Sequence, residues 1–210
     1  MLRIKVIGES HSQLFDNIPQ YKRGLWNSQV LLDKFDVKYI GPLTLYRICR
    51  DGFNSIEEIK NIKNGDTCML SFGEIDIRCH IIKQSQIQGI KVEDIIDEMC
   101  EMLKKRFLDF NYNLYNFHVL SVLPPIEKYK CIGPNPEFPF IGTDKERSDA
   151  TIYLNMKLEK ICKQLNVGYF NQYDLYVDVN GFLDYEKSDY IVHAIKTLDL
   201  ENYTIKYFSL

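Results

Sequence analysis

Ser10 is the residue of this sequence best placed to act as a nucleophile. It follows the apolar run 3–7 and Gly8, at a point where a short strand is expected to end. A serine hydroxyl is a weak nucleophile and needs a base within hydrogen-bond reach. The chemistry that this position suggests is acyl transfer, in which the serine oxygen attacks an acyl carbon. The flanking residues Glu9 and His11 are predicted to contact the substrate.

Four histidines could supply the base, at positions 11, 80, 118 and 193. His118 lies in an apolar run and is predicted to be structural. His193 lies four residues after Asp189, a spacing that puts both side chains on one face of a helix. An acid beside the base can orient the imidazole and stabilise its charged form. We therefore predict that Ser10, Asp189 and His193 are catalytic, with helix capping as the alternative role of Asp189.

A second group of ionisable side chains occurs in residues 74–82. Glu74, Asp76, Arg78 and His80 alternate there with apolar residues, so in an extended segment all four would face the same way. This face is predicted to bind substrate, and a salt-bridged structural network is the alternative. The carboxylates and the histidine could in principle ligate a metal, but no metal is expected.

The chain alternates between strand-like and helix-like segments. Strands are predicted over 3–7, 37–40, 66–72, 117–123 and 173–179, and helices over 43–49, from Ser55, over 93–107, around 154–165 and over 188–197. Residues 126–148 are rich in proline and glycine and are predicted to be mostly loop. The alternation predicts a single domain over 1–210, a three-layer α/β/α sandwich with a mainly parallel sheet. Ligands bind such sheets beyond the carboxyl ends of the strands.

Composition limits the functions that this chain can have. The protein has 210 residues, of which 45% are hydrophobic and 26% charged, and a net charge of −3. The basic surface of a nucleic-acid-binding protein is therefore not expected, and no apolar run approaches the length of a membrane span. The six cysteines include no CxxC pair, so buried free thiols and a reducing compartment are predicted. The N-terminus does not resemble a signal peptide, and we predict a cytoplasmic location.

Taken together, these segments resemble the SGNH hydrolase superfamily, also called GDSL-like. Residues 6–10 (VIGES) match its first block, which carries the nucleophile, and Gly41 matches the second-block glycine, whose N–H helps to form the oxyanion hole. Residues 73–76 (GEID) match the third block, and residues 188–193 (SDYIVH) match the last. The four blocks occur in the expected order and span nearly the whole chain. The resemblance implies a flavodoxin-like sheet with Ser10 as the nucleophile.

The chain departs from the pattern of the superfamily in three ways. Glu9 replaces the usual aspartate, and Ile75 stands where an asparagine usually donates to the oxyanion. The acid and the histidine of the last block are four residues apart instead of three. Because isoleucine cannot donate a hydrogen bond, either Arg78 substitutes for the asparagine or the hole depends on the N–H groups of Ser10 and Gly41.

The resemblance implies ester hydrolysis or acyl transfer, often of acetyl groups on carbohydrates. The absence of an export signal favours acetyl transfer from acetyl-CoA, as co-substrate, to a sugar or nucleotide sugar, without a tightly bound cofactor. An SGNH esterase or deacetylase is the first alternative, and a non-catalytic carbohydrate-binding accessory domain is the second. A transferase could form an acyl-Ser10 intermediate. Its acceptor could instead attack the thioester directly, with His193 as the base and Ser10 only shaping the pocket.

Overall fold

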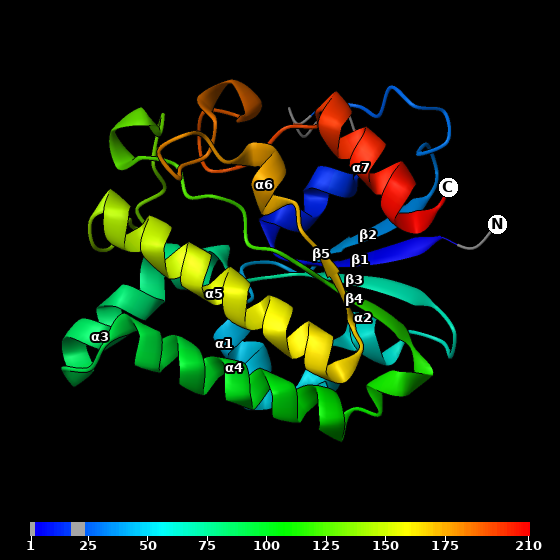
Figure 1. The fold of residues 1–210 in the computed structure, drawn as a ribbon, viewed down its shortest axis with the longest axis horizontal. Coiled ribbons are helices and arrows are strands. Elements are labelled where there is room, and N and C mark those ends of the chain that lie inside the picture. Colours follow the sequence, from blue (N-terminus) through cyan, green and yellow to red (C-terminus); the bar gives the residue numbers. More distant parts are fainter. Residues whose placement is uncertain (1–2, 18–23) are drawn as a thin grey trace.

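The structure is a computed structural model that describes residues 3–17 and 24–210. Its centre is a five-stranded parallel sheet with the strand order β2-β1-β3-β4-β5 (Figure 1). The strands are β1 (Ile4–Gly8), β2 (Phe35–Tyr39), β3 (Thr67–Ser71), β4 (Asn116–Leu120) and β5 (Gly168–Phe170). This is the flavodoxin-like order, in which the direction of winding reverses between β1 and β3. The predicted three-layer α/β/α fold is confirmed.

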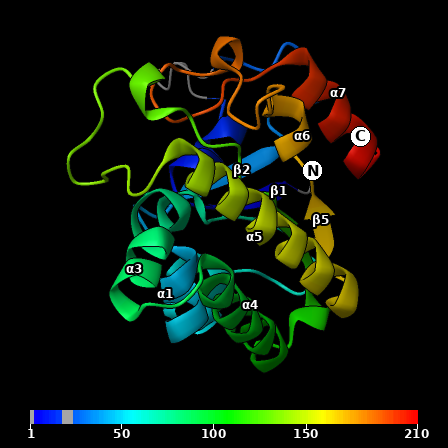
Figure 2. The ribbon, with the colours of Figure 1, turned by 60° about the vertical axis from the view of Figure 1, so that its left-hand side comes forward.

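Helices cover both faces of the sheet. They are α1 (Leu45–Asp51), α2 (Glu57–Lys60), α3 (Ile82–Gln88), α4 (Val92–Asp109), α5 (Asp144–Leu165), α6 (Tyr173–Tyr176) and α7 (Leu198–Phe208). Figures 1 and 2 show α1, α4 and α5 on one side of the sheet and α6 and α7 on the other. Among the described residues, the helices are too short or too polar to cross a membrane.

Side-chain alternation along the strands divides the core into two parts. On β1, Ile4 and Val6 pack in the core beneath α7, whereas Ile7 packs in the core beneath α1, α4 and α5. On β3, Met69 and Leu70 separate in the same way, because successive strand residues point to opposite faces. Both faces of the sheet are therefore buried, and the loops at the carboxyl ends of the strands are left to form the site.

The predicted elements of the N-terminal half are largely confirmed, with one correction. The first four strands lie where they were predicted, to within a few residues. The helix predicted from Ser55 is much shorter than a capping box would suggest. It begins at Glu57 after Ile56, and the Ser55 hydroxyl donates to the Gly52 carbonyl at 2.6 Å instead of capping the helix.

The C-terminal half differs more from the prediction. Residues 173–179 are not a strand: α6 occupies the first four, and Tyr176 is completely buried with its hydroxyl donating to Ile195 O at 2.7 Å. The last strand, β5, lies earlier. Its three residues give too little alternation to be recognised. Residues 188–197 are not a helix, and α7 follows them instead.

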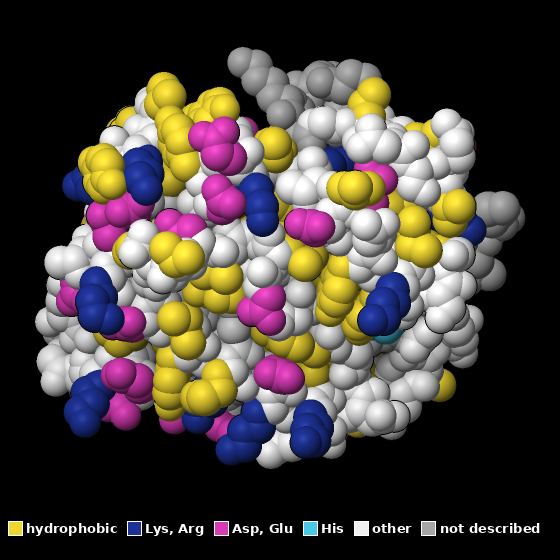
Figure 3. Space-filling view, turned by 45° about the horizontal axis from the view of Figure 1, so that its top comes forward, with side chains coloured by type: hydrophobic (Ala, Val, Ile, Leu, Met, Phe, Trp, Pro, Cys, Tyr) yellow, Lys and Arg dark blue, Asp and Glu magenta, His cyan; other side chains and the backbone are white. Residues whose placement is uncertain are grey.

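The face of the molecule in Figure 3 carries both signs of charge in mixture. On the face in Figure 3, Lys and Arg side chains are interspersed with Asp and Glu side chains instead of gathering by sign. Nucleic-acid binding depends chiefly on clustered Lys and Arg that meet phosphates. This face shows no such cluster.

Candidate active site

The end of β1 places Ser10 beside β3. Gly8 lies so close to β3 that a β-carbon on it would be 2.2 Å from the Ser71 carbonyl oxygen, so only glycine fits there. The Glu9 N–H donates to the same Ser71 oxygen at 3.1 Å. The chain then turns into a short 3₁₀ helix, Ser10–Phe15. Ser10 therefore stands at the carboxyl edge of the sheet, at the point where the winding reverses.

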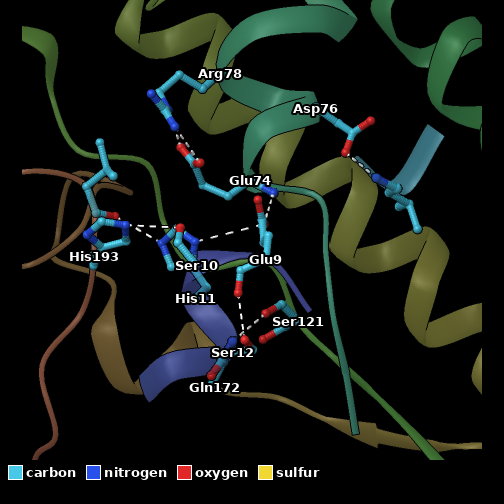
Figure 4. A network of polar contacts seen from close by, with 12 residues as sticks. Glu9, Ser10, His11, Ser12, Glu74, Asp76, Arg78, Ser121, Gln172 and His193 are labelled. Atoms are coloured by element: carbon cyan, nitrogen blue, oxygen red, sulfur yellow. Dashed lines mark hydrogen bonds and ion pairs between the residues drawn. The ribbon is translucent and has the colours of Figure 1, made fainter. Parts of the chain in front are cut away.

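Ser10, His193 and Asp189 form a continuous hydrogen-bonded relay. The Ser10 Oγ lies 3.0 Å from His193 Nε2 (Figure 4), and His193 Nδ1 lies 2.7 Å from Asp189 Oδ2. A carboxylate can only accept, so Nδ1 carries the ring proton and Nε2 is left to accept from the serine hydroxyl. This is the tautomer that a general base for Ser10 requires.

The Asp189 carboxylate is held in its ionised form. Partial burial alone would raise its pKa, but hydrogen bonds from the His193 ring and from the backbone N–H groups of His193 and Ile191 lower the pKa of Asp189 to about 2. Asp189 is therefore charged throughout the neutral range and can stabilise an imidazolium on His193.

A tight turn, and not a helix, joins Asp189 to His193. The Asp189 N–H donates to the His193 carbonyl at 2.8 Å, and Asp189 Oδ1 accepts from the N–H groups of Ile191 and His193 at 2.9 and 3.0 Å. Tyr190 has a φ of 65°. Asp189 thus caps its own turn while it orients the histidine. This geometry explains how an acid four residues before the base, instead of three, still reaches it.

Residues 74–82 are helical, so the predicted extended face is wrong. A π-helical segment, Asp76–Ile81, runs directly into α3. Residues four apart share a side of a helix, and Glu74 accordingly accepts from Arg78 Nε and Nη2 at 2.5 and 3.0 Å. Arg78 Nη1 also donates to the Phe138 carbonyl at 2.6 Å. Figure 4 shows the guanidinium directed at Glu74 instead of at Ser10.

The ion pair keeps Glu74 charged inside the protein. Burial would raise the pKa of Glu74, but the charge and hydrogen bonds of the Arg78 guanidinium hold it below its usual range. Removing one partner of such a buried pair leaves the other charge uncompensated. Arg78 and Glu74 therefore support the alternative of a structural network, which fixes the loop containing Phe138.

Asp76 and His80 lie on a different side of the helix and line a second cavity, away from Ser10. Asp76 is fully buried, and its two oxygens accept from the N–H groups of Leu45 and Tyr46 at 2.6 and 3.0 Å. These N–H groups begin α1. Burial raises the pKa of Asp76 to about 6.

The raised pKa of Asp76 predicts a pH-dependent stability. An acid whose pKa rises on folding favours the folded state when protonated, so this contribution is lost as the pH rises from about 4 to above 6. Relative to Asp76→Asn, the wild-type free energy of unfolding should fall by roughly 2 kcal/mol between pH 4.5 and 7.5. Urea unfolding of both proteins at pH 4.5 and 7.5 measures the difference. Parallel changes in the two proteins would refute this role of Asp76.

Glu9 and His11 lie beneath the site. Glu9 is 1% exposed, and its Oε1 accepts from the Glu74 N–H at 2.9 Å. Burial, reinforced by the charge of Glu74, raises the pKa of Glu9 well above its usual value. His11 Nε2 lies 3.0 Å from the Val192 carbonyl. Because a carbonyl only accepts, Nε2 must carry a proton.

Glu9, His11 and Glu74 also form the one group of metal-ligating type found among the described residues, with ligand atoms within 4.8 Å of one another. Both oxygens of Glu74 are already bound to the Arg78 guanidinium, whose positive charge would repel a cation. The arrangement therefore resembles a hydrogen-bonded support more than a metal site.

The His11 contact predicts that this residue positions the catalytic base. Val192 immediately precedes His193, so the bond ties the nucleophile segment to the base. His11→Leu should lower kcat by roughly 10²-fold with little change in KM, because a displaced His193 loses its alignment with Ser10. His11→Gln can still donate to Val192 and should restore most of the rate. Steady-state kinetics on an ester substrate tests the pair, and equal losses in both variants would contradict this role.

Ser10 and His193 open into a cavity of about 310 Å³. Most of its wall is apolar or aromatic, and the lining includes Tyr39, Pro42, Ile75, Cys131, Pro134, Phe138, Phe140, Ile191 and Val192. Arg78 also contributes to the wall. Gly41 follows β2 with a φ of 78°, between two lining residues. The oxyanion roles of the Ser10 and Gly41 N–H groups, and of Arg78, stay predictions.

The loop at residues 131–140 supplies much of the cavity wall, and sequence reasoning assigned it no function. It follows β4, so its place beyond a strand end was a usable signal. The residues facing the site could not be identified, because prolines and glycines give the loop no periodicity.

No protein-family model and no curated protein sequence matches this chain. Solved structures with a similar fold include a GDSL-like lipase from Bacteroides thetaiotaomicron, with a TM-score of 0.58 and 12% identity over 99% of this chain and 85% of that one. The OSK domain of Drosophila Oskar has a TM-score of 0.57 and 10% identity, with 100% of this chain and 89% of that domain covered. An acetyl xylan esterase has a TM-score of 0.50 and 14% identity, with 98% of each chain covered. These comparisons confirm the predicted α/β/α fold, which the chain shares with a GDSL-like lipase.

Proposed function

We propose that this protein is a serine esterase that hydrolyses acyl esters through Ser10. The observation that carries this proposal is the relay of 3.0 and 2.7 Å that joins Ser10, His193 and Asp189 at the mouth of a cavity. The fold is shared with a lipase and an acetyl xylan esterase, which supports ester hydrolysis. A fold alone does not determine an activity, whereas a serine, a base and an acid in hydrogen-bonded sequence are the groups that this chemistry requires.

The reaction follows from the geometry. His193 Nε2 takes the proton from Ser10 as the serine oxygen attacks the ester carbonyl, and Asp189 stabilises the imidazolium. The proton then passes from His193 to the departing alcohol, which leaves acyl-Ser10. Water, activated by the same histidine, releases the acid and restores the serine. The oxyanion is stabilised by the N–H groups of Ser10 and Gly41, because Ile75 offers no donor and Arg78 is engaged by Glu74.

The cavity favours an apolar acyl group. Its lining near Ser10 includes Ile75, Phe138 and Phe140, and such walls gain free energy by burying hydrocarbon. Arg78, the one full charge among the described lining residues, is already neutralised by Glu74. An anionic acyl group would therefore find no free cation among those residues.

Hydrolysis of 4-nitrophenyl esters of increasing acyl length tests the proposal. We expect nitrophenol release by the wild type, with kcat/KM rising from acetate to butyrate or hexanoate, and none above background for Ser10→Ala. No release with any ester would overturn the proposal.

Acetyl transfer from acetyl-CoA to a sugar or nucleotide sugar shares the same first step and differs in the acceptor. A parallel assay with acetyl-CoA and a panel of sugars distinguishes the two. Thiol release that requires a sugar, without nitrophenol release, would identify a transferase. The absence of both activities would support a non-catalytic accessory domain.

Replacing Ile75 with asparagine should increase the activity. The side chain is 4% exposed and lines the cavity with Ser10, at the position where the superfamily pattern has an asparagine donor. One oxyanion donor is worth about 10²–10³ in rate, so Ile75→Asn should raise kcat by roughly tenfold even when the new amide is imperfectly placed. Ile75→Leu is the matched control and should not gain. An Asn variant slower than the Leu variant would contradict this oxyanion geometry.

A further inference from the structure

A second and larger cavity lies on the far side of residues 74–82 from Ser10. It has a volume of about 540 Å³ and is bounded by residues of α1, α3 and α4 and of the π-helical segment Asp76–Ile81. Pro42 lines both this cavity and the catalytic one. The Gly41-Pro42 segment therefore lies between the two spaces, and its Gly41 N–H is a predicted oxyanion donor.

Three of the four ionisable groups that alternate in the sequence are divided between these cavities. Arg78, paired with Glu74, lines the catalytic cavity, whereas Asp76 and His80 line the second one. The π-helical backbone that carries them is a rare conformation, often found at functional sites. The proposed ester chemistry uses neither Asp76 nor His80, so this side of the segment has no role in it.

Several of the polar groups around the second cavity are available to a ligand, although Asp76 and Thr44 already accept hydrogen bonds from the first N–H groups of α1. Within the described residues, no hydrogen bond or ion pair engages the Arg47 guanidinium, the His80 ring or the Glu98 carboxylate. Gln84 makes one side-chain hydrogen bond, accepting from Gln88 at 3.3 Å. The apolar part of the lining includes Ile95, Met99 and Met102. The cavity thus combines an apolar surface with donors and acceptors that have no other partner or only one.

Its charge pattern indicates the class of ligand. Arg47 lines the cavity together with the acids Glu98 and Asp76. Charges of both signs therefore surround it, and neither a phosphate nor a cation would meet a wall of purely opposite charge. The two glutamine amides can both donate and accept, as paired hydroxyl groups require. Tyr46 is 48% exposed at the edge and offers an aromatic face. These features together suit a neutral, hydroxyl-rich molecule such as a sugar unit.

We propose that the second cavity binds the alcohol part of the ester, a neutral hydroxyl-rich moiety, while the acyl part occupies the cavity at Ser10. The scissile bond would then lie over the Gly41-Pro42 segment, within reach of Ser10. The assignment to the alcohol part rests on the proposed esterase function, whereas binding of a neutral sugar by this cavity does not.

Equilibrium binding tests the cavity independently of catalysis. Calorimetry on Ser10→Ala with maltose, cellobiose and lactose should show saturable binding of at least one, and weaker binding of glucose 6-phosphate and glucosamine. Adding Gln84→Ala should weaken that binding at least tenfold. Gln86→Ala is the matched control on the same helix, exposed and outside the lining, and should change nothing. No binding of any neutral disaccharide, tighter binding of the charged sugars, or equal effects of the two glutamine variants would overturn the proposal.

Kinetics tests the link to the ester. The two substrates compared are 4-nitrophenyl acetate and an O-acetylated form of the sugar that binds. In Gln84→Ala, KM for the acetylated sugar should rise at least tenfold relative to KM for the nitrophenyl ester, whereas Gln86→Ala should keep the wild-type ratio. An unchanged ratio in Gln84→Ala, with hydrolysis intact, would refute the assignment to the alcohol part. Absence of all ester hydrolysis by the wild type would instead refute the esterase function and leave the binding result to decide the cavity.

Discussion

Ser10→Ala should lower kcat for ester hydrolysis at least about 10⁴-fold, and adding His193→Ala should then lower it little further. The two side chains act as one unit through their 3.0 Å contact, so a base without its nucleophile has no proton to accept. Residual rate would come from binding and from the backbone donors of the oxyanion hole. Steady-state kinetics of the two single variants and the double variant measures this non-additivity.

The same set of variants separates covalent catalysis from direct attack by an acceptor. If Ser10 only shaped the pocket, Ser10→Ala would retain much of the rate while His193→Ala would not. Losses that simply multiply in the double variant would likewise contradict a shared unit. Thermal unfolding midpoints close to that of the wild type would show that the variants fold, since both side chains lie at the cavity and outside the core.

Asp189→Asn should lower kcat by about 10⁴-fold. The asparagine amide can donate to His193 Nδ1, which favours the tautomer with the proton on Nε2, where it cannot accept from Ser10. The variant also loses the charge that stabilises the imidazolium. The turn should survive, because the amide oxygen can still accept from the N–H groups of Ile191 and His193. Kinetics at neutral pH measures the loss.

Asp184→Asn is the matched control for Asp189→Asn. Asp184 caps a nearby 3₁₀ turn through the Glu186 N–H at 3.2 Å and has no contact with the relay. It should keep wild-type activity. A mild effect of Asp189→Asn, comparable with that of Asp184→Asn, would show that Asp189 is only a turn residue.

The position of Ser10 beyond the first strand could be predicted because its signals are local. Gly8 and Ser10 lie at the end of a strongly apolar run, where the position of a strand is clear. The partnership of Asp189 and His193 was predicted, but the reason was wrong, since the prediction required a helix. The turn depends on Tyr190 at positive φ and on a self-capping aspartate, which four-residue spacing does not distinguish from one helical turn.

Residues 74–82 show why periodicity can mislead. The apolar residues at every second position suggested an extended segment, yet Glu74, Asp76 and Arg78 are buried together with Ile75 and Ile77. Residues 74–79 are buried without exception, so this part of the helix has no solvent-facing side to impose a period of 3.6. Polar residues are tolerated at alternate positions because each finds a hydrogen-bonding partner inside the protein, as Glu74 does with Arg78.

Contacts over long sequence separations could not be predicted. His11 and Val192 are 181 residues apart, and nothing in either segment indicates the other. The same holds for Asp76, which caps a helix that begins some thirty residues earlier. These contacts arise because parallel strands bring their carboxyl ends to one edge, which the fold class predicts only as a general location.

Trapping of the acyl-enzyme measures most directly whether Ser10 is the nucleophile. The wild-type protein is mixed with 4-nitrophenyl butyrate or a fluorophosphonate, quenched in acid within milliseconds to seconds, digested and analysed by mass spectrometry. We predict an adduct on the peptide that contains Ser10, localised to that residue by fragmentation and missing from both Ser10→Ala and Asp189→Asn after a short exposure. Rapid ester hydrolysis by the wild type without an adduct on Ser10, or with one on another residue, would contradict the assignment of Ser10 as the nucleophile.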